Sequence, residues 1–302
     1  MLLTAVIPTK NEGRNIRACI ESFLPAVREG WGEVIVVDNG SEDDTVLEVE
    51  SWKLNVERSA SSTETSNIQH STSNIQQPSS PIRILQKGPE RSAQRNEGWR
   101  QARGEYVFFV DADMRVPEET LREIQRKIQS TEKADAYFVR EVRIGDGWWT
   151  RVRNFERSFY DATCIDALRV IRRSVLEQVE GYDETMTGPE DWDLDRKILQ
   201  VTQNVALTDG HLLHDEQRLT FRRLLQKKAY YSGAFEIYQR KWNHDAVIRK
   251  QFGLWYRFFG VFLEKGKWKR VVTHPHYMVA IWFERMCVGM VYLTRRKKHA
   301  QD

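Results

Sequence analysis

The stretch VFFVDADMRV, residues 107–116, decides the fold, because an apolar run within it stops abruptly at two aspartates. The run over 106–110 has the length and the β-branched and aromatic residues of a buried strand. Asp111 and Asp113 follow it with one alanine between them. Side chains two residues apart on an extended chain point the same way, so both carboxylates enter one crevice. Two close like charges are costly unless a cation shares them, although acids before Pro117 are also typical of a helix start.

Apolar runs alternate with helical patterns over the first half of the chain. Strands are predicted at 2–7, 33–37, 82–85, 106–110 and 134–139, and helices at 13–27, 43–51, 90–102 and 117–129. This alternation predicts an α/β domain whose mainly parallel sheet is flanked by helices. A further helix at 188–200 and a late strand at 204–208 complete the domain, which we place at residues 1–215.

Polar turns follow three of the five predicted strands: PTKNE at 8–12, DNGSED at 38–43 and DADMRV at 111–116. In an open parallel sheet, ligands bind outside the carboxyl ends of the strands, so these turns converge on one site. A hard cation such as Mg²⁺ or Mn²⁺ takes one or two carboxylates and fills its shell with phosphate oxygens. The aspartate pair therefore predicts a metal that holds a diphosphate. Asp38 binds a base or ribose in this interpretation, or else forms an Asx-turn or a helix cap.

A second acidic cluster, TGPEDWDLD at 187–195, opens the helix predicted at 188–200. Acids at a helix N-terminus ordinarily complement the helix dipole. Four acids within six residues exceed that need, and they are Glu190, Asp191, Asp193 and Asp195. A carboxylate at this place is suited to act as a general base toward a hydroxyl. Trp192 lies among the acids and is a candidate to face a sugar ring.

Four motifs, in this order and spacing, resemble family 2 glycosyltransferases of the GT-A fold: VIPTKNE, VVDNGSEDDT, GPERSAQRNEGWRQARGEYVFFVDADMRV and GYDETMTGPEDWDLDRKI. Each motif is weak alone, but the ordered set is specific and covers residues 2–200. The resemblance implies a Rossmann-like sheet that binds a nucleotide-diphosphate sugar. It also implies an enzyme that transfers the sugar with inversion of configuration.

The resemblance further implies roles for single residues around the donor. The nucleotide-sugar pocket would be formed by Pro8, Thr9, Asn11, Glu12, Asp38, Arg91, Arg95, Asn96 and Asp111. Glu12 would lie near the ribose or the base. Asp38 would bind the base, as in uridine-binding members of the family, which favours a UDP-sugar. The two arginines and Asn96 would lie beside the diphosphate or the donor sugar.

Metal binding and catalysis follow from the same resemblance. Asp113 would hold the metal ion, Mn²⁺ or Mg²⁺, with Asp111 reaching the metal or the ribose. His214, in HLLHDEQRLT after the last predicted strand, is a candidate third ligand or else a structural histidine. Asp191 would be the catalytic base that deprotonates the acceptor hydroxyl, and Glu190 is its rival for that role.

The predicted activity is inverting, metal-dependent transfer to a hydroxyl of a lipid-linked acceptor or of a cell-surface glycan, as in cell-envelope polysaccharide. The chain lacks the paired spanning helices of polyprenyl-phosphate sugar transferases and the QxxRW run of processive synthases, which favours single transfers. A polyprenyl-phosphate sugar transferase and a non-catalytic nucleotide-sugar binding module stay open. A nucleotidyltransferase would want a glycine-rich phosphate loop, which residues 2–20 lack. No nucleic-acid partner is expected.

Two segments depart from the α/β pattern. Residues 57–81 are rich in Ser, Thr, Asn and Gln and predict a disordered insertion, with a recognition loop as the alternative. Residues 216–302 predict long helices at 219–242, 246–263 and 277–294. From residue 264 onward nine Lys or Arg face three Asp or Glu in a chain whose net charge is +3, so this helical C-terminal region is basic.

The last predicted helix, YMVAIWFERMCVGMVYLT, has the length of a membrane span but carries Glu284 and Arg285 at its centre. With RRKK directly after it, the pattern favours a helix that lies on an anionic membrane surface, or else a packed helix with a solvated basic end. Three scattered cysteines and an opening without a basic n-region predict a cytoplasmic protein. We expect it to be peripheral on the inner face of the cytoplasmic membrane.

Overall fold

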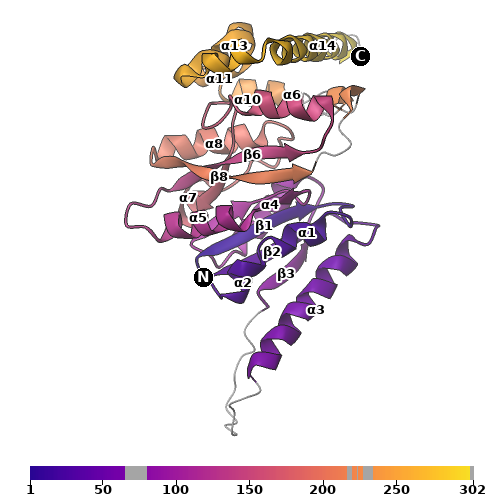
Figure 1. Ribbon diagram of the computed structural model, residues 1–302, viewed down its shortest axis with the longest axis vertical. Helices are drawn as coiled ribbons and strands as arrows, with labels where there is room; N and C mark the ends of the chain where they lie inside the picture. Colours follow the sequence, from indigo (N-terminus) through magenta and orange to yellow (C-terminus); the bar gives the residue numbers. More distant parts are fainter. Residues whose placement is uncertain (65–79, 216–219, 223, 227–233, 300–302) are drawn as a thin grey trace.

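The structure is a computed structural model that describes residues 1–64, 80–215, 220–222, 224–226 and 234–299 (Figure 1). These residues form one eight-stranded sheet in the order β3-β2-β1-β4-β7-β6-β8-β5. The strands are β1 Leu3–Thr9, β2 Gly32–Asp38, β3 Ile82–Gln86, β4 Tyr106–Phe109, β5 Met114–Arg115, β6 Ala136–Ile144, β7 Leu168–Arg172 and β8 Val205–Asp215. The four strands from β3 to β4 are parallel, and the pairs β4/β7, β7/β6 and β8/β5 are antiparallel. The predicted α/β fold is confirmed, with a sheet that becomes mixed toward β5.

Helices cover both faces of the sheet and continue into the C-terminal region. They are α1 Ile16–Glu21, α2 Leu24–Arg28, α3 Thr45–Glu64, α4 Arg91–Arg100, α5 Glu118–Gln129, α6 Trp148–Arg157, α7 Arg173–Val179, α8 Glu190–Val201, α10 Phe235–Lys241, α11 Ala246–Phe252, the π-helix η2 Tyr256–Gly260, α12 Val261–Leu263, the 3₁₀-helix η3 Glu264–Gly266, α13 Trp268–Thr273 and α14 Pro275–His299. Two of these, α1 and α2, replace the single helix predicted at 13–27, because Pro25 has no N–H with which to continue α1.

Helix α3 is longer than the predicted helix at 43–51. It runs to Glu64 and therefore includes the first eight residues of the insertion predicted at 57–81. Residues 65–79 of that insertion lie outside the described residues. In Figure 1, α3 is the lowest helix of the molecule, at the end remote from the C-terminal helices.

Strand β4 is buried on both faces, which explains why its sequence is a continuous apolar run. Tyr106 and Phe108 belong to the core beneath α1, α2 and α5. Val107 and Phe109 belong to the core on the other face, beneath α4, α7 and α8. The aspartates that follow β4 thus emerge from the centre of the sheet.

Strand β7 is absent from the sequence-based prediction, and β8 is longer than the predicted strand at 204–208. β8 pairs with β6 along one edge and with the two-residue β5 along the other, where Met114 lies opposite His214. The prediction that His214 follows the last strand is therefore wrong, because His214 lies within β8. Strand pairing between distant segments leaves little local pattern, and for that reason it escapes a reading of the sequence.

The C-terminal helices form a layer beyond α6 (Figure 1). Val261, Phe262, Met278 and Ile281 pack in one core cluster with Val152 of α6. The single helix predicted at 246–263 is wrong, since α11 ends before Gly253 and the chain resumes as η2. None of the helices in the described parts of the chain has both the length and the apolar character that crossing a bilayer requires.

Candidate active site

A cleft of about 280 Å³ opens at the carboxyl ends of β1 and β4. It is lined by Pro8, Thr9, Lys10, Glu12, Arg91, Gln94, Asp111, Ala112, Asp113 and His214. Seven of these are site residues predicted from the sequence, whereas Lys10, Gln94 and Ala112 are not. The convergence follows from the parallel register, which sets Val6 of β1 opposite Phe109 of β4 and aligns the two turns that follow.

Helix α4 packs against the ends of β1 and β2 beside the cleft. Gln94 donates its amide N–H groups to the backbone carbonyls of Thr9 and Val37, at 2.9 and 2.6 Å, and so ties the ends of β1 and β2 together. The helix lies close to the sheet because Gly98 has no side chain, and a Cβ there would be 2.4 Å from Cγ1 of Val6. The buried hydroxyl of Thr9 has no hydrogen-bond partner among the described residues.

Asp113 and His214 face each other across the cleft although 101 residues separate them. The Asp113 Oδ2 and the His214 Nε2 are 3.1 Å apart. The contact results from the β5/β8 pairing, in which the backbone N–H of Asp215 also donates to the carbonyl of Asp113. The structure thus brings together two of the three residues that the sequence proposes as metal ligands, whereas the third, Asp111, bonds to Arg95.

This pair fits a hard divalent cation. Ligand atoms on adjacent corners of an octahedron with bonds of about 2.1 Å lie about 3 Å apart, as the two atoms here do. No three His, Cys, Asp or Glu side chains in the described regions form a group that could hold a metal ion. A Mg²⁺ or Mn²⁺ ion usually completes its shell with water and substrate phosphates, so two protein ligands beside an open cleft suffice.

The other nitrogen of His214 contacts Glu141, which the sequence analysis missed. The His214 Nδ1 lies 2.9 Å from Glu141 Oε1. Burial lowers the pKa of His214, but the hydrogen bonds with Asp113 and Glu141 outweigh it and raise that pKa to about 9. Burial by itself would raise the pKa of Glu141, but the positive charges of Arg157, Arg143 and the imidazole hold that pKa well below its usual value. Glu141 is therefore an anionic partner that orients the imidazole.

Arg169 of β7 is another buried residue that sequence reasoning missed. It lies 3.5 Å from Glu141, and the nearby carboxylates of Asp191 and Asp111 raise its pKa although burial lowers it. A charged residue inside the apolar run ALRVI is the one signal in the sequence that marked this position.

Arg95 connects the two acidic motifs. It is almost fully buried, and it donates to Asp111 and to Asp191, both at 2.8 Å. Its guanidinium also lies over the Tyr182 ring, 5.2 Å from the centroid. Burial raises the pKa of Asp111, but Arg95, Arg91 and Arg169 outweigh it and hold that pKa well below its usual value. Asp111 is thus held by arginines, whereas Asp113 faces the histidine.

Glu190 and Asp191 begin α8, and the two differ in exposure. The Glu190 side chain is 2% exposed, forms an ion pair with Arg91 at 2.9 Å, and accepts from the backbone N–H of Gly188. Burial and the charge of Asp191 raise the pKa of Glu190. The Asp191 side chain is 26% exposed and contacts Arg95 and the Tyr182 hydroxyl. Of the two, Asp191 is the carboxylate that an incoming hydroxyl can reach.

The remaining acids of α8 are structural in this arrangement. Asp193 accepts from Trp242 Nε1 at 2.7 Å and from Lys241 at 2.9 Å. Asp195 accepts from the backbone N–H of Leu168, and burial raises its pKa well above the usual value. Trp192 packs among the rings of Phe235, Tyr238 and Phe252 of the C-terminal region. Of the four acids in this motif, only Glu190 and Asp191 therefore remain candidates for the site.

Three further predicted residues lie outside the cleft lining. Both carboxylate oxygens of Asp38 accept hydrogen bonds, from Ser41 three residues further on and from Gln86, so this side chain is engaged in the turn that follows β2. Asn11 caps the same turn by accepting from the backbone N–H of Glu42. Asn96 is buried and bonds to the backbone of Tyr182 through both ends of its amide. These side chains position the loops around the cleft.

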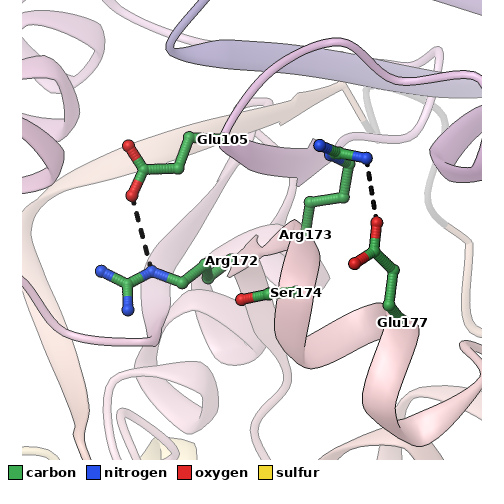
Figure 2. A pocket seen from close by; sticks show the side chains of 5 residues that line it. All are labelled: Glu105, Arg172, Arg173, Ser174 and Glu177. Carbon is green, nitrogen blue, oxygen red and sulfur yellow. Dashed lines mark hydrogen bonds and ion pairs between the residues drawn. The ribbon is translucent and has the colours of Figure 1, made fainter.

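A second hollow lies at the opposite ends of the strands, where Glu105 precedes β4 and Arg172 ends β7 (Figure 2). Figure 2 shows Arg172 directed toward Glu105, and Arg173 directed toward Glu177 one turn along α7. The charges are balanced, because Arg173 bonds to Glu177 at 2.9 Å and Arg172 to Asp135 at 2.9 Å. Because the cleft at β1 and β4 gathers the predicted site residues and this hollow gathers none, that cleft is the candidate active site.

Comparisons with known proteins agree with this fold. The model of the family described as glycosyl transferase family 2 matches residues 4–246. The chain resembles the solved structure of S. aureus TarS 1-349 with a TM-score of 0.54 and 15% identity, covering 100% of this chain and 92% of that one. It also resembles the mannosyltransferase PcManGT from Pyrobaculum calidifontis, solved with GDP-Man and Mn²⁺, with a TM-score of 0.55 and 18% identity over 99% and 84% of the two chains. The search of curated proteins finds no match.

The family match covers most of the chain. The protein therefore belongs to glycosyl transferase family 2 and is a glycosyltransferase. The structural neighbours support the GT-A type of fold, and the resemblance seen in the sequence motifs is confirmed.

Proposed function

We propose that this protein is an inverting, metal-dependent glycosyltransferase that moves a sugar from a nucleotide-diphosphate donor to a hydroxyl of a cell-surface glycan or lipid-linked acceptor. The observation that carries the proposal is the convergence of Asp113, His214 and Arg91 on the cleft, with Asp191 joined through Arg95 to Asp111 of the cleft lining. Such a transfer needs a metal-binding pair, here Asp113 and His214, and a positive group for the phosphates, here Arg91. It also needs an accessible carboxylate as base, here Asp191.

The donor in this proposal is a UDP-sugar. TarS has been solved with UDP-GlcNAc, which supports uracil, whereas PcManGT has been solved with GDP-Man. The Arg91 guanidinium would bind the diphosphate of the nucleotide in the cleft. Asp38 would contribute to base recognition by holding the turn at 38–41 in place.

The cofactor in this proposal is Mn²⁺ or Mg²⁺, held by Asp113 and His214 and neutralising charge on the diphosphate when bound. Asp191 removes the proton of the acceptor hydroxyl as that oxygen attacks the anomeric carbon. The bond from the anomeric carbon to the diphosphate breaks in the same step, and the electron pair leaves with the nucleoside diphosphate. Arg95 keeps Asp191 and Asp111 in position through its two 2.8 Å hydrogen bonds. Inversion needs no second nucleophilic carboxylate, because no sugar-enzyme intermediate forms.

The donor and the metal site are tested together with purified protein and a panel of UDP-, GDP- and dTDP-sugars in Mn²⁺ or Mg²⁺. We expect release of UDP from one sugar nucleotide, dependent on the metal. Asp113→Ala should abolish this metal dependence, whereas the control Asp209→Ala, which removes an exposed acid remote from the cleft, should leave it unchanged. Equal turnover in Asp113→Ala and wild type would refute the metal site. Absence of donor binding across the panel would refute the donor assignment.

The base is tested by comparing Asp191→Asn with Glu190→Gln under conditions where donor binding is measured separately. Loss of a general base costs about 10²–10⁴-fold in rate. We expect a loss of that size in Asp191→Asn, with donor affinity preserved. A near-normal rate would instead support a phosphate acceptor, as in a polyprenyl-phosphate sugar transferase, which needs little base catalysis.

A further inference from the structure

The outermost helices carry an exposed apolar surface that their packing does not explain. Ten of the seventeen large hydrophobic side chains that are exposed among the described residues lie between Leu254 and Met290. Single exposed hydrophobic residues are normal on soluble proteins, but a dense group of them marks an interaction site.

The exposed residues recur at helical spacing. Trp255, Phe259 and Leu263 are four residues apart along η2 and α12, and Trp268 and Val272 are four apart on α13. Residues at this spacing lie on one side of a helix. The inner side of the same segment is buried, with Tyr256 at its start.

Helix α14 repeats the arrangement. Val279, Phe283, Met286 and Met290 are exposed, whereas Met278 and Ile281 are buried against α6. The two sets lie on opposite sides of the helix. Figure 1 shows α11, α13 and α14 as the outermost layer, beyond α6 and α10. We call the exposed apolar residues of segment 254–290 the outer face.

The segment that carries the outer face is strongly basic. Between residues 246 and 290, eight Lys or Arg face two Asp or Glu. One of the acids, Glu284, and one of the bases, Arg285, are buried against α6 and contribute nothing to the surface, which leaves seven Lys or Arg and one Glu. Arg249, Lys269 and Arg270 are exposed near the two tryptophans. Apolar residues with tryptophan and lysine or arginine on one surface are typical of helices that lie in the interface of an anionic bilayer.

We propose that the outer face is a docking surface for a bilayer containing anionic phospholipid, on which the enzyme lies without crossing it. A second copy of the chain is a poor occupant, because a two-fold contact would set this basic segment against itself. The proposal extends the proposed function, since a lipid-linked acceptor would be presented at the same surface. Its test measures lipid binding alone, so it can fail while the transfer activity stands.

The test is flotation of the full-length protein with vesicles of phosphatidylcholine, alone or mixed with phosphatidylglycerol. We expect binding to the mixed vesicles only, weakened by high salt, because the attraction to anionic lipid is screened. Quenching of tryptophan fluorescence by brominated lipid, compared with its loss in Trp255→Phe and Trp268→Phe, reports whether these two of the ten tryptophans enter the interface. No flotation with the mixed vesicles at low salt would overturn the proposal.

Matched variants separate insertion from general surface polarity. Leu254 is 76% exposed and Leu47 of α3 is 67% exposed, so glutamate should be tolerated equally in the fold at both positions. Leu254→Glu combined with Val272→Glu should reduce vesicle partitioning about tenfold or more, whereas Leu47→Glu should leave it unchanged. Lys269→Glu should weaken binding to the mixed vesicles alone. Equal partitioning of all variants would contradict the proposal, as would a dimer in light scattering that the double variant dissociates.

Discussion

The imidazole of His214 lies between two carboxylates of different character. Glu141 on one side is buried and lies within 3.5 Å of three arginines, Arg143, Arg157 and Arg169, so it remains ionised and accepts the Nδ1 proton. Asp113 on the other side faces the cleft. With Nδ1 held by Glu141, the imidazole would lose its Nε2 proton when a cation binds next to Asp113, and Nε2 would then face that cation. A single residue outside the cleft lining therefore orients the ring of a proposed metal ligand.

At the residue scale we predict that Glu141→Gln weakens Mn²⁺ binding about 10–100-fold, because partners of a ligating histidine contribute that much to metal affinity. Isothermal titration or the electron paramagnetic resonance signal of free Mn²⁺ measures it. Glu156→Gln is the matched control, since Glu156 is also buried and paired with arginine but does not contact the histidine. An unchanged Mn²⁺ affinity in Glu141→Gln, with the fold intact by circular dichroism, would show that Glu141 does not position the ligand.

At the scale of elements, one buried carboxylate joins the strands at the end of the sheet opposite the cleft. Glu33 in β2 accepts from the Thr4 hydroxyl of β1 at 2.8 Å and from the backbone N–H of Arg103 at 2.7 Å. Arg83 of β3 lies 3.3 Å away. Burial raises the pKa of Glu33, but the hydrogen bonds from Arg103 and Thr4 outweigh it and lower that pKa below its usual value.

We predict that Glu33→Gln lowers the free energy of unfolding at pH 7 by about 1–3 kcal/mol, because a buried hydrogen-bonded charge is lost. A lowered folded-state pKa stabilises the fold fully above the unfolded-state pKa of about 4.3, and the effect disappears as the pH falls through the folded-state pKa. Urea unfolding of both proteins should therefore differ at pH 7 and converge as the pH falls below about 4. Glu29→Gln, at an exposed ion pair, should change stability little at either pH. A difference that persists at low pH would show that the charge is not responsible.

At the scale of the whole molecule, the C-terminal helices and the α/β domain share a core. Phe262 packs against Phe159, which follows α6, with ring centroids 4.9 Å apart. Arg285 of α14 donates to Glu156 and to the Tyr160 hydroxyl, at 2.6 and 2.9 Å. The boundary that we placed at residue 215 coincides with the end of β8. These contacts nevertheless join the C-terminal helices to the α/β domain in one core, so we expect the two parts to unfold together.

We predict one cooperative unfolding transition for the described unit, which scanning calorimetry and far-ultraviolet circular dichroism should report at the same temperature. Phe262→Ala should lower the stability of the whole by about 3–5 kcal/mol, because it leaves a cavity in the shared core. Phe259→Ala is the matched control on the same segment, since Phe259 is 49% exposed whereas Phe262 is 2% exposed. Two separate transitions, of which Phe262→Ala shifts only one, would show that the C-terminal region is an independent domain.

Local patterns in the sequence determined the α/β class, the strands β1 to β4, the polar turns that follow them, and the family. The reason is that these features lie within single strand–helix units, where periodicity and turn chemistry are visible over about ten residues. Pro8, Thr9, Glu12, Arg91, Asp111 and Asp113 all line the cleft, because parallel strands present their carboxyl ends at one edge. The roles assigned to them stay predictions.

Only the tertiary structure decided which distant groups meet. The pairing of β5 with β8 sets His214 beside Asp113, and the approach of α4 to α8 sets Arg95 between Asp111 and Asp191. Burial also separated Asp191, which is accessible, from Asp193 and Asp195, which are tied into the structure. Contacts across about a hundred residues depend on how the whole chain packs, and neither residue type nor spacing along the sequence records them.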